Sequence, residues 1–91
     1  MVRIYTVENC PYCNELKGIL QNEGVQFVEI DVNKPENEAE FNKLFEITKC
    51  DDVPMVKVGN QLLIPHTSFR SIREASYLVK KLLSESDTLL K

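Results

Sequence analysis

The sequence predicts an α/β domain in the order β-α-β-α-β-β-α, with one four-stranded mixed sheet flanked by helices. Two observations carry this prediction. A helical pattern separates the first two β-branched segments, so a crossover must join them and their strands should pair in parallel. The turn signal Gly59-Asn60 separates two further apolar runs, which indicates an antiparallel hairpin. Helices packed on one sheet are the economical way to bury these elements.

The first three elements follow from the residue pattern. Residues 2–7 are β-branched and aromatic, which favours a strand. Residues 11–23 carry apolar side chains at helical spacing, with Pro11 suited to a first helical position and Gly24 suited to a helix end. Residues 25–30 return to the composition of a strand. Together they predict one β-α-β unit.

The second half of the chain predicts a helix, a hairpin and a last helix. Residues 36–47 have apolar side chains at helical spacing. The hairpin strands are expected at 55–58 and 61–64, and a final amphipathic helix at 68–83. Three phenylalanines are expected in the core: Phe41, Phe45 and Phe69.

Length and composition narrow the classes of function. The 91 residues allow one domain, which we place at residues 1–84, followed by a frayed tail at 85–91. The formal net charge of −3 offers no basic face to nucleic acid, and no apolar run approaches the ~20 residues that span a membrane. No secretory signal is visible, and an odd number of cysteines argues against a secreted disulfide framework. We therefore expect a cytoplasmic monomer.

Cys10 and Cys13 form a Cys-X-X-Cys pair between the first strand and the first helix. The unpaired N–H groups of a first helical turn stabilise a thiolate, which can lower the pKa of such a cysteine from about 8.5 to between roughly 3.5 and 7.5. A static disulfide and a zinc site shared with Cys50 and His66 are the alternatives. A disulfide across so short a loop gains little, and structural zinc normally shows a second tight pair. We favour an exchange-active pair, with Cys50 as a passive hydrophobe and His66 as polar surface.

The exchange chemistry gives each cysteine a role. The Cys10 thiolate attacks a substrate disulfide, and the more buried Cys13 then attacks Cys10 and releases the reduced substrate. Pro11 fixes the turn between the two cysteines, and Tyr12 offers an aromatic face beside the nucleophile.

Cys10-Pro11-Tyr12-Cys13 after a strand, with Val53-Pro54 before a hairpin, resembles the glutaredoxin family over nearly the whole chain. The resemblance implies a thioredoxin fold, Cys10 as nucleophile and Cys13 as resolving thiol. It implies no tightly bound cofactor and glutathione as a co-substrate. It also implies a cis peptide bond before Pro54, beside which the backbone of Val53 pairs with an extended substrate. The expected substrate-binding residues are then Pro11, Tyr12, Val53 and Pro54.

Three departures from the family pattern concern the glutathione site. Val7 stands where glutaredoxins usually carry a lysine, three positions before the first cysteine. Asp51 and Asp52 precede Val53, where an arginine or a similar residue is usual. Residues 64–67 replace the usual Gly-Gly pair, against which the γ-glutamyl end of glutathione lies. Because acidic side chains repel the carboxylates of glutathione, the sequence predicts weak use of glutathione.

Ser68-Phe69-Arg70 is similar to a segment of NrdH-type redoxins, which are reduced by thioredoxin reductase instead of glutathione. Either resemblance implies disulfide proteins as partners, among them ribonucleotide reductase. Glutaredoxins can also share an iron–sulfur cluster between two subunits, but a proline directly after Cys10 and a poor glutathione site count against that role. The intact cysteine pair disfavours a non-catalytic binding module of the same fold.

Overall fold

A computed structural model describes residues 2–90 and the side chains of residues 2–85. Its elements follow in the predicted order, with a short 3-10 helix added before the second helix. Their bounds are β1 Val2–Thr6, α1 Pro11–Asn22, β2 Val28–Asp31, η1 Pro35–Asn37, α2 Glu38–Thr48, β3 Met55–Val58, β4 Gln61–Leu63 and α3 Ile72–Leu90. Within this described range, no helix combines the length and the apolar composition that crossing a membrane requires.

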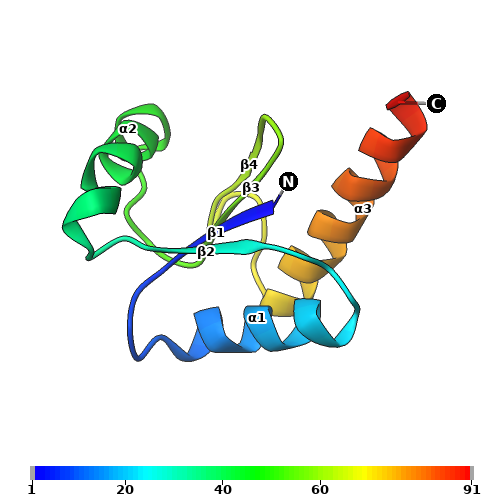
Figure 1. Ribbon diagram of the computed structural model, residues 1–91, viewed down its shortest axis with the longest axis horizontal. Helices are drawn as coiled ribbons and strands as arrows, with labels where there is room; N and C mark the ends of the chain where they lie inside the picture. The colour runs from blue at the N-terminus through cyan, green and yellow to red at the C-terminus, as the bar shows by residue number, and fades with distance from the viewer. Residues whose placement is uncertain (1, 91) are drawn as a thin grey trace.

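The four strands form one mixed sheet in the order β2-β1-β3-β4, so β1 has a partner on each side (Figure 1). β1 and β2 run parallel, with Tyr5 opposite Ile30. β3 pairs antiparallel with both β1 and β4. The predicted mixed sheet, its parallel pair and its hairpin are confirmed.

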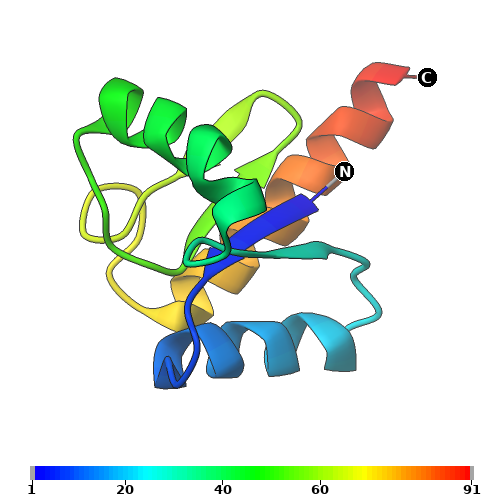
Figure 2. The same ribbon diagram turned by 60° about the vertical axis from the view of Figure 1, so that its left-hand side comes forward.

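Helices cover both faces of the sheet (Figure 2). α1 and α3 pack on one face, over a main core made of Val2, Ile4, Leu16, Leu20, Val56, Val58, Leu63, Phe69, Ile72, Ala75 and Val79. α2 covers the other face, over a smaller group that we call the α2 cluster: Tyr5, Ile30, Leu44 and Met55. Neighbouring residues of a strand point to opposite faces, so β1 contributes Ile4 to one core and Tyr5 to the other.

Three chain segments meet at one end of the sheet. Since β1 and β2 are parallel, Thr6 lies opposite Asp31 at their common carboxyl end. β3 runs the other way and therefore begins, with Met55, near that same end. The loops that follow β1 and precede β3 emerge together, and they carry Cys10 and Pro54. We call this the disulfide end of the sheet.

The last helix begins later than the predicted residue 68. α3 starts at Ile72, because the Ser71 hydroxyl accepts a hydrogen bond from the N–H of Glu74 at 3.1 Å and so caps the helix there. The preceding residues form a loop that belongs to the candidate site.

The helix also ends later than predicted. α3 continues to Leu90, through most of the segment 85–91 that was expected as a frayed tail. Residue 91 and the side chains of residues 86–90 lie outside the described residues. The placement of a domain boundary at residue 84 therefore stays a prediction.

β2 begins at Val28, three residues later than predicted. The N–H of Val25 bonds back to the carbonyl of Leu20 at 2.9 Å, so Val25 still belongs to the end of α1. Gly24 adopts a φ of 75° there, the left-handed conformation that suits glycine after a helix. The role predicted for Gly24 is confirmed.

Phe45 is not a core residue, although its spacing predicts one. Its side chain is 42% exposed, whereas Leu44 is buried and Phe41 packs against the α2 cluster. α2 contacts the sheet along a narrow stripe through Phe41 and Leu44, and Phe45 lies about 100° further around the helix than Leu44.

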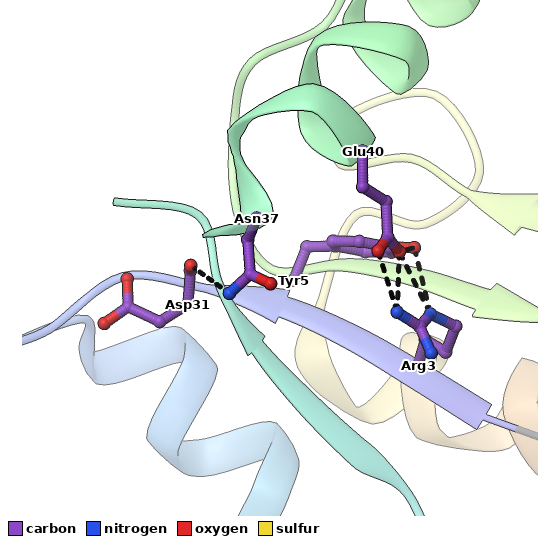
Figure 3. Close-up of polar contacts among 5 residues, drawn as sticks. All are labelled: Arg3, Tyr5, Asp31, Asn37 and Glu40. Atoms are coloured by element: carbon purple, nitrogen blue, oxygen red, sulfur yellow. Dashed lines mark hydrogen bonds and ion pairs between the residues drawn. The ribbon is translucent and has the colours of Figure 1, made fainter. Parts of the chain in front are cut away.

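A polar cluster ties α2 to the centre of the sheet (Figure 3). The Tyr5 hydroxyl donates to Oε2 of Glu40 at 2.5 Å, and Nη2 of Arg3 donates to both carboxylate oxygens of Glu40 at 2.8 Å. Burial raises the pKa of Tyr5, while the hydrogen bond from Tyr5 is the main cause that lowers the pKa of Glu40. Beside this cluster, Asn37 donates to the carbonyl of Asp31 at 2.9 Å and fixes the turn from β2 into η1.

Replacing Glu40 with glutamine should lower the free energy of unfolding by about 0.5 to 1.5 kcal/mol near neutral pH. Glutamine keeps an oxygen for Tyr5 but loses the charge that faces Arg3, and the pair is partly exposed to solvent. Urea titrations of Glu40→Gln and of Glu46→Gln, an exposed position on the same helix, measure the difference. An equal loss in both variants would contradict the role of the cluster.

The stability difference between the wild type and Glu40→Gln should depend on pH. The folded-state pKa of Glu40 is lowered, so its carboxylate contributes stability fully above the ordinary pKa of 4.5 and loses it as the pH falls through the folded-state value. Urea midpoints of the two proteins should therefore converge in acid. A gap that is constant from neutral pH down to strong acid would be the opposite result.

Candidate active site

The cysteine pair lies at the disulfide end, where α1 begins. Cys10 precedes the helix with φ −100° and ψ 105°, and Cys13 lies within its first turn. A disulfide joins them, with the two Cα atoms 5.2 Å apart. The N–H of Cys13 points at the Cys10 sulfur at 3.1 Å, and the N–H of Asn14 bonds to the Cys10 carbonyl at 3.0 Å. The Cys10 sulfur therefore sits at the positive end of the helix dipole.

The local sequence explains this arrangement. Asn9 adopts a φ of 59°, a left-handed conformation that asparagine tolerates better than most residues, and turns the chain into the helix. Pro11 occupies the first helical position, where its missing N–H costs no hydrogen bond. Cys13 is fully buried, as expected, whereas Cys10 keeps part of its surface exposed. Of the two sulfurs, Cys10 is the one that an external thiol or disulfide can reach.

A second polar group holds α1 in place near the cysteines. Nζ of Lys17 lies 2.6 Å from Oε2 of Glu29, and the same oxygen accepts a hydrogen bond from the buried Thr6 hydroxyl at 2.9 Å. The hydrogen bond from Lys17 is the main cause that lowers the pKa of Glu29. Because Lys17 lies about one turn after Cys13, these contacts tie the cysteine-bearing helix to both parallel strands.

The peptide bond between Val53 and Pro54 is cis, as the resemblance predicted. Pro54 is buried and Val53 is half-buried. Neither the N–H nor the C=O of Val53 makes a hydrogen bond to any other residue that the structure describes. Both backbone groups of Val53 are thus available to an extended chain laid beside it.

A groove of about 210 Å³ opens next to Val53 and the cysteine pair. We call it the Tyr12 groove; it is lined by Tyr12, Val53, Pro54, Pro65, His66, Phe69, Arg70, Ser71 and Ile72. Tyr12 is 64% exposed and forms the wall nearest the cysteines. The structure therefore brings together three of the residues predicted to bind substrate, Tyr12, Val53 and Pro54, whereas Pro11 lies in the helix start beside them.

The opposite wall of the groove is the loop between β4 and α3. The N–H groups of Thr67 and Ser68 bond to the Ile64 carbonyl at 3.1 and 2.8 Å, and the N–H of Ile64 bonds to the Ser68 hydroxyl at 3.0 Å. His66 adopts a φ of 67° and its N–H bonds to the Phe69 carbonyl at 3.0 Å. This compact loop occupies the position at which the resemblance leads one to expect a Gly-Gly pair, and its N–H groups are engaged within the loop.

The start of α3 closes the groove and is capped by the chain itself. Oε1 of Glu74 accepts a hydrogen bond from the N–H of Arg70 at 2.7 Å, while Ser71 caps the N–H of Glu74. Sequence reasoning missed this cap at Ser71, although Ser-X-X-Glu is a known signature of a helix start. Phe69 is 4% exposed, as expected of a core residue, and it also lines the groove.

The charges near Val53 are acidic. Asp51 and Asp52 are both exposed, and Val7, at the position of the usual lysine, is half-buried. Nε2 of His66 lies 3.7 Å from Oδ2 of Asp52. His66 is an exposed polar side chain, as predicted, and it also reaches the groove.

Cys50 does not join the cysteine pair. It carries a free thiol and packs, half-buried, against the α2 cluster, which agrees with its predicted role as a small hydrophobe. Among the side chains that the structure describes, no group of three or more His, Cys, Asp or Glu residues is arranged to hold a metal ion. The alternative zinc site from the three cysteines and His66 is therefore not assembled.

Comparison with known proteins identifies relatives of the chain. The family model described as Glutaredoxin matches residues 2–63. Glutaredoxin 3 of Escherichia coli is 33% identical over 60 residues, which cover 66% of this chain and 70% of that protein. A glutaredoxin of Pseudomonas aeruginosa is 42% identical over 59 residues, which cover 64% of this chain and 67% of that protein.

Two of the solved structures of similar shape are plant glutaredoxins. A wheat glutaredoxin superposes with a TM-score of 0.68 at 22% identity, covering 92% of this chain and 79% of that one. A buckwheat glutaredoxin, solved in complex with glutathione, gives a TM-score of 0.70 at 20% identity, covering 92% of this chain and 76% of that one. These likenesses confirm the predicted thioredoxin fold.

The reduced protein should be alkylated by iodoacetamide at Cys10 with an apparent pKa clearly below that of an ordinary thiol, because the helix start stabilises the thiolate. The variant Cys13→Ser/Cys50→Ser isolates Cys10, and Cys10→Ser/Cys13→Ser isolates Cys50 as the matched control. Mass spectrometry across a pH series gives both rates. Should Cys10 need strongly alkaline solution to react, its activation by the helix would be wrong.

Proposed function

Because the chain belongs to the glutaredoxin family, we propose that it reduces protein disulfides, or mixed disulfides with glutathione, through the Cys10–Cys13 pair. The observation that supports this most is the position of Cys10. Cys10 is half-buried at the mouth of α1 and is bonded to the fully buried Cys13, while Tyr12, between the two cysteines, lines an open groove. Family, fold and dithiol together support a thiol–disulfide oxidoreductase.

The reduced protein begins the proposed cycle. The Cys10 thiolate attacks one sulfur of the substrate disulfide, so a mixed disulfide forms and the other substrate sulfur leaves as a thiolate. Cys13, after giving up its proton, attacks the Cys10 sulfur and releases the second substrate thiolate. The substrate has then gained two electrons, and the protein holds the Cys10–Cys13 disulfide seen in the structure.

The Tyr12 groove is proposed to hold the substrate during this exchange. The free N–H and C=O of Val53 would pair with an extended segment around the substrate cysteine, as strands add to a sheet. Tyr12 and Pro54 would flank the reacting sulfurs, and Pro11 would keep Cys10 at the helix start. These assignments follow the family pattern at the matching positions of this chain.

The electron source that we propose is thioredoxin reductase rather than glutathione. Glutathione carries carboxylates at both ends, and the charges beside Val53 are acidic. The Glu74 carboxylate already accepts the hydrogen bond of the Arg70 N–H at the groove, so this N–H is not available to a carboxylate of glutathione. The proposed setting is the cytosol, with ribonucleotide reductase as one disulfide partner, as both family resemblances imply.

Replacing Cys10 with serine should abolish the reduction of every disulfide substrate, because the attacking sulfur is lost. Replacing Cys13 should abolish reduction of protein disulfides but leave glutathione mixed disulfides reducible, since free glutathione can resolve them. Insulin reduction and a glutathione-mixed-disulfide assay test the two variants, with Cys50→Ser as a control that keeps both activities. Full activity of Cys10→Ser would contradict the proposed function.

Thioredoxin reductase with NADPH should support about tenfold faster turnover than glutathione with glutathione reductase at matched concentrations. Glu74→Gln, which keeps an acceptor for the Arg70 N–H but removes the charge, should raise the glutathione-supported rate about threefold. NADPH oxidation reports both rates. Glutathione-supported turnover equal to or faster than the thioredoxin reductase rate would show that the electron source is wrong.

A further inference from the structure

We infer that the disulfide end selects protein disulfides whose cysteines are flanked by lysine or arginine, and that it discriminates against acidic ones. This inference rests on the proposed function and adds a substrate class to it. Three independent features carry it: the charges around Cys10, the internally capped start of α3, and the path that a bound segment would take past Val53.

The charges around Cys10 are predominantly negative on both sides of the cysteine pair. On the β3 side, Asp51 and Asp52 directly precede Val53, and both are exposed. On the β2 side, a hollow of about 430 Å³ is lined by Glu8, Glu29, Ile30, Asp31, Lys34, Glu36 and Asn37. Four of these seven residues are acidic and one is basic. A disulfide that approaches Cys10 therefore passes between two acidic borders.

Basic groups oppose this field on both sides. On the β2 side, Lys34 lines the hollow, and Nζ of Lys17 pairs with Glu29 at 2.6 Å. On the β3 side, three basic groups oppose it. Lys49 is exposed two residues before Asp51, and Arg70 is exposed on the far wall of the groove. His66 faces Asp52 at 3.7 Å and offsets it only when protonated. Asp51 makes no ion pair with any described residue, so its charge faces solvent and an incoming ligand.

The start of α3 already holds a negative group of the chain itself, the Glu74 carboxylate. A helix start ordinarily attracts negative groups through its free N–H donors and its dipole. Here the Glu74 carboxylate accepts the N–H of Arg70 at 2.7 Å, and the Ser71 hydroxyl accepts the N–H of Glu74 at 3.1 Å. An anionic ligand would have to displace or lie against a carboxylate that is already in place. The groove thus lacks the feature that would balance the acidic borders.

Pairing with the backbone of Val53 would determine where the cationic side chains of a substrate lie. A segment paired with the free backbone of Val53 runs past the residues next to it, Asp52 and Asp51. Successive residues of an extended chain are spaced by about 3.3 Å. A lysine or arginine one to three positions from the substrate cysteine therefore reaches these carboxylates. The proposed ligand is an extended, cationic, disulfide-bearing segment of a protein.

Two synthetic peptides with one intramolecular disulfide test the inference, identical except for lysine or glutamate at the positions flanking the cysteines. With the protein recycled by dithiothreitol, kcat/KM should be about threefold to tenfold higher for the lysine peptide in low salt. The preference should shrink in 0.5 M sodium chloride, because salt screens exposed charges. Equal rates, or a preference for the glutamate peptide, would overturn the inference.

Reversing the charge of single residues shows which part of the protein causes the preference for the lysine peptide. Asp51→Lys should bring the ratio of the two rates close to one, whereas Glu85→Lys should leave it unchanged. Glu85 is exposed near the far end of α3, and its substitution makes the same change in net charge. If both substitutions reduce the ratio equally, the preference arises from the net charge of the protein and not from the residues at the disulfide end.

A binding measurement separates this inference from the proposed function. The same peptides with serine in place of cysteine are titrated into the oxidised protein, and fluorescence anisotropy reports their dissociation constants. If neither disulfide peptide is reduced, the proposed function fails, and tighter binding of the lysine peptide alone would still support the charge preference. If disulfides are reduced but the two peptides bind equally, the preference fails and the proposed function stands.

Discussion

The hydrogen bonding of β1 to a parallel and an antiparallel neighbour is the constraint on which the site depends. Parallel pairing with β2 forces α1 to cross over the sheet, so the helix must begin just beyond the end of β1. Antiparallel pairing with β3 returns the chain to the same end. Cys10 and Pro54, more than forty residues apart, become neighbours because both pairings share one strand.

This arrangement places a sulfur that needs positive surroundings within an acidic surface, and the range of each interaction explains how both coexist. The N–H of Cys13 lies 3.1 Å from the Cys10 sulfur, and a hydrogen bond to a charged group is worth about 1.5 to 3 kcal/mol. A carboxylate such as Asp51 acts through solvent, where two charges about 8 Å apart interact by only about 0.5 kcal/mol. Backbone dipoles can therefore set the ionisation of Cys10 while exposed side chains sort its substrates.

Sequence reasoning succeeded where the signal is local. The β-branched first strand, Pro11 at a helix start, Gly24 at its end and the Gly59-Asn60 turn each depend on a few neighbouring residues. The cis bond before Pro54 was found through a family resemblance, since nothing local distinguishes it. Phe45 was misplaced because spacing cannot tell how wide a stripe of a short helix meets the sheet.

The site is less predictable than the fold. The Ser71 cap was readable in principle, but the apolar periodicity continues through Phe69 and hides the helix start. The loop wall of the Tyr12 groove depends on contacts between Ile64 and Ser68 that no sequence pattern predicts.

The burial of Cys13 has a kinetic consequence: the electron donor and the disulfide substrate must both react at Cys10, one after the other. Turnover should follow a double-displacement scheme, in which the electron donor and the disulfide substrate compete for reaction at Cys10.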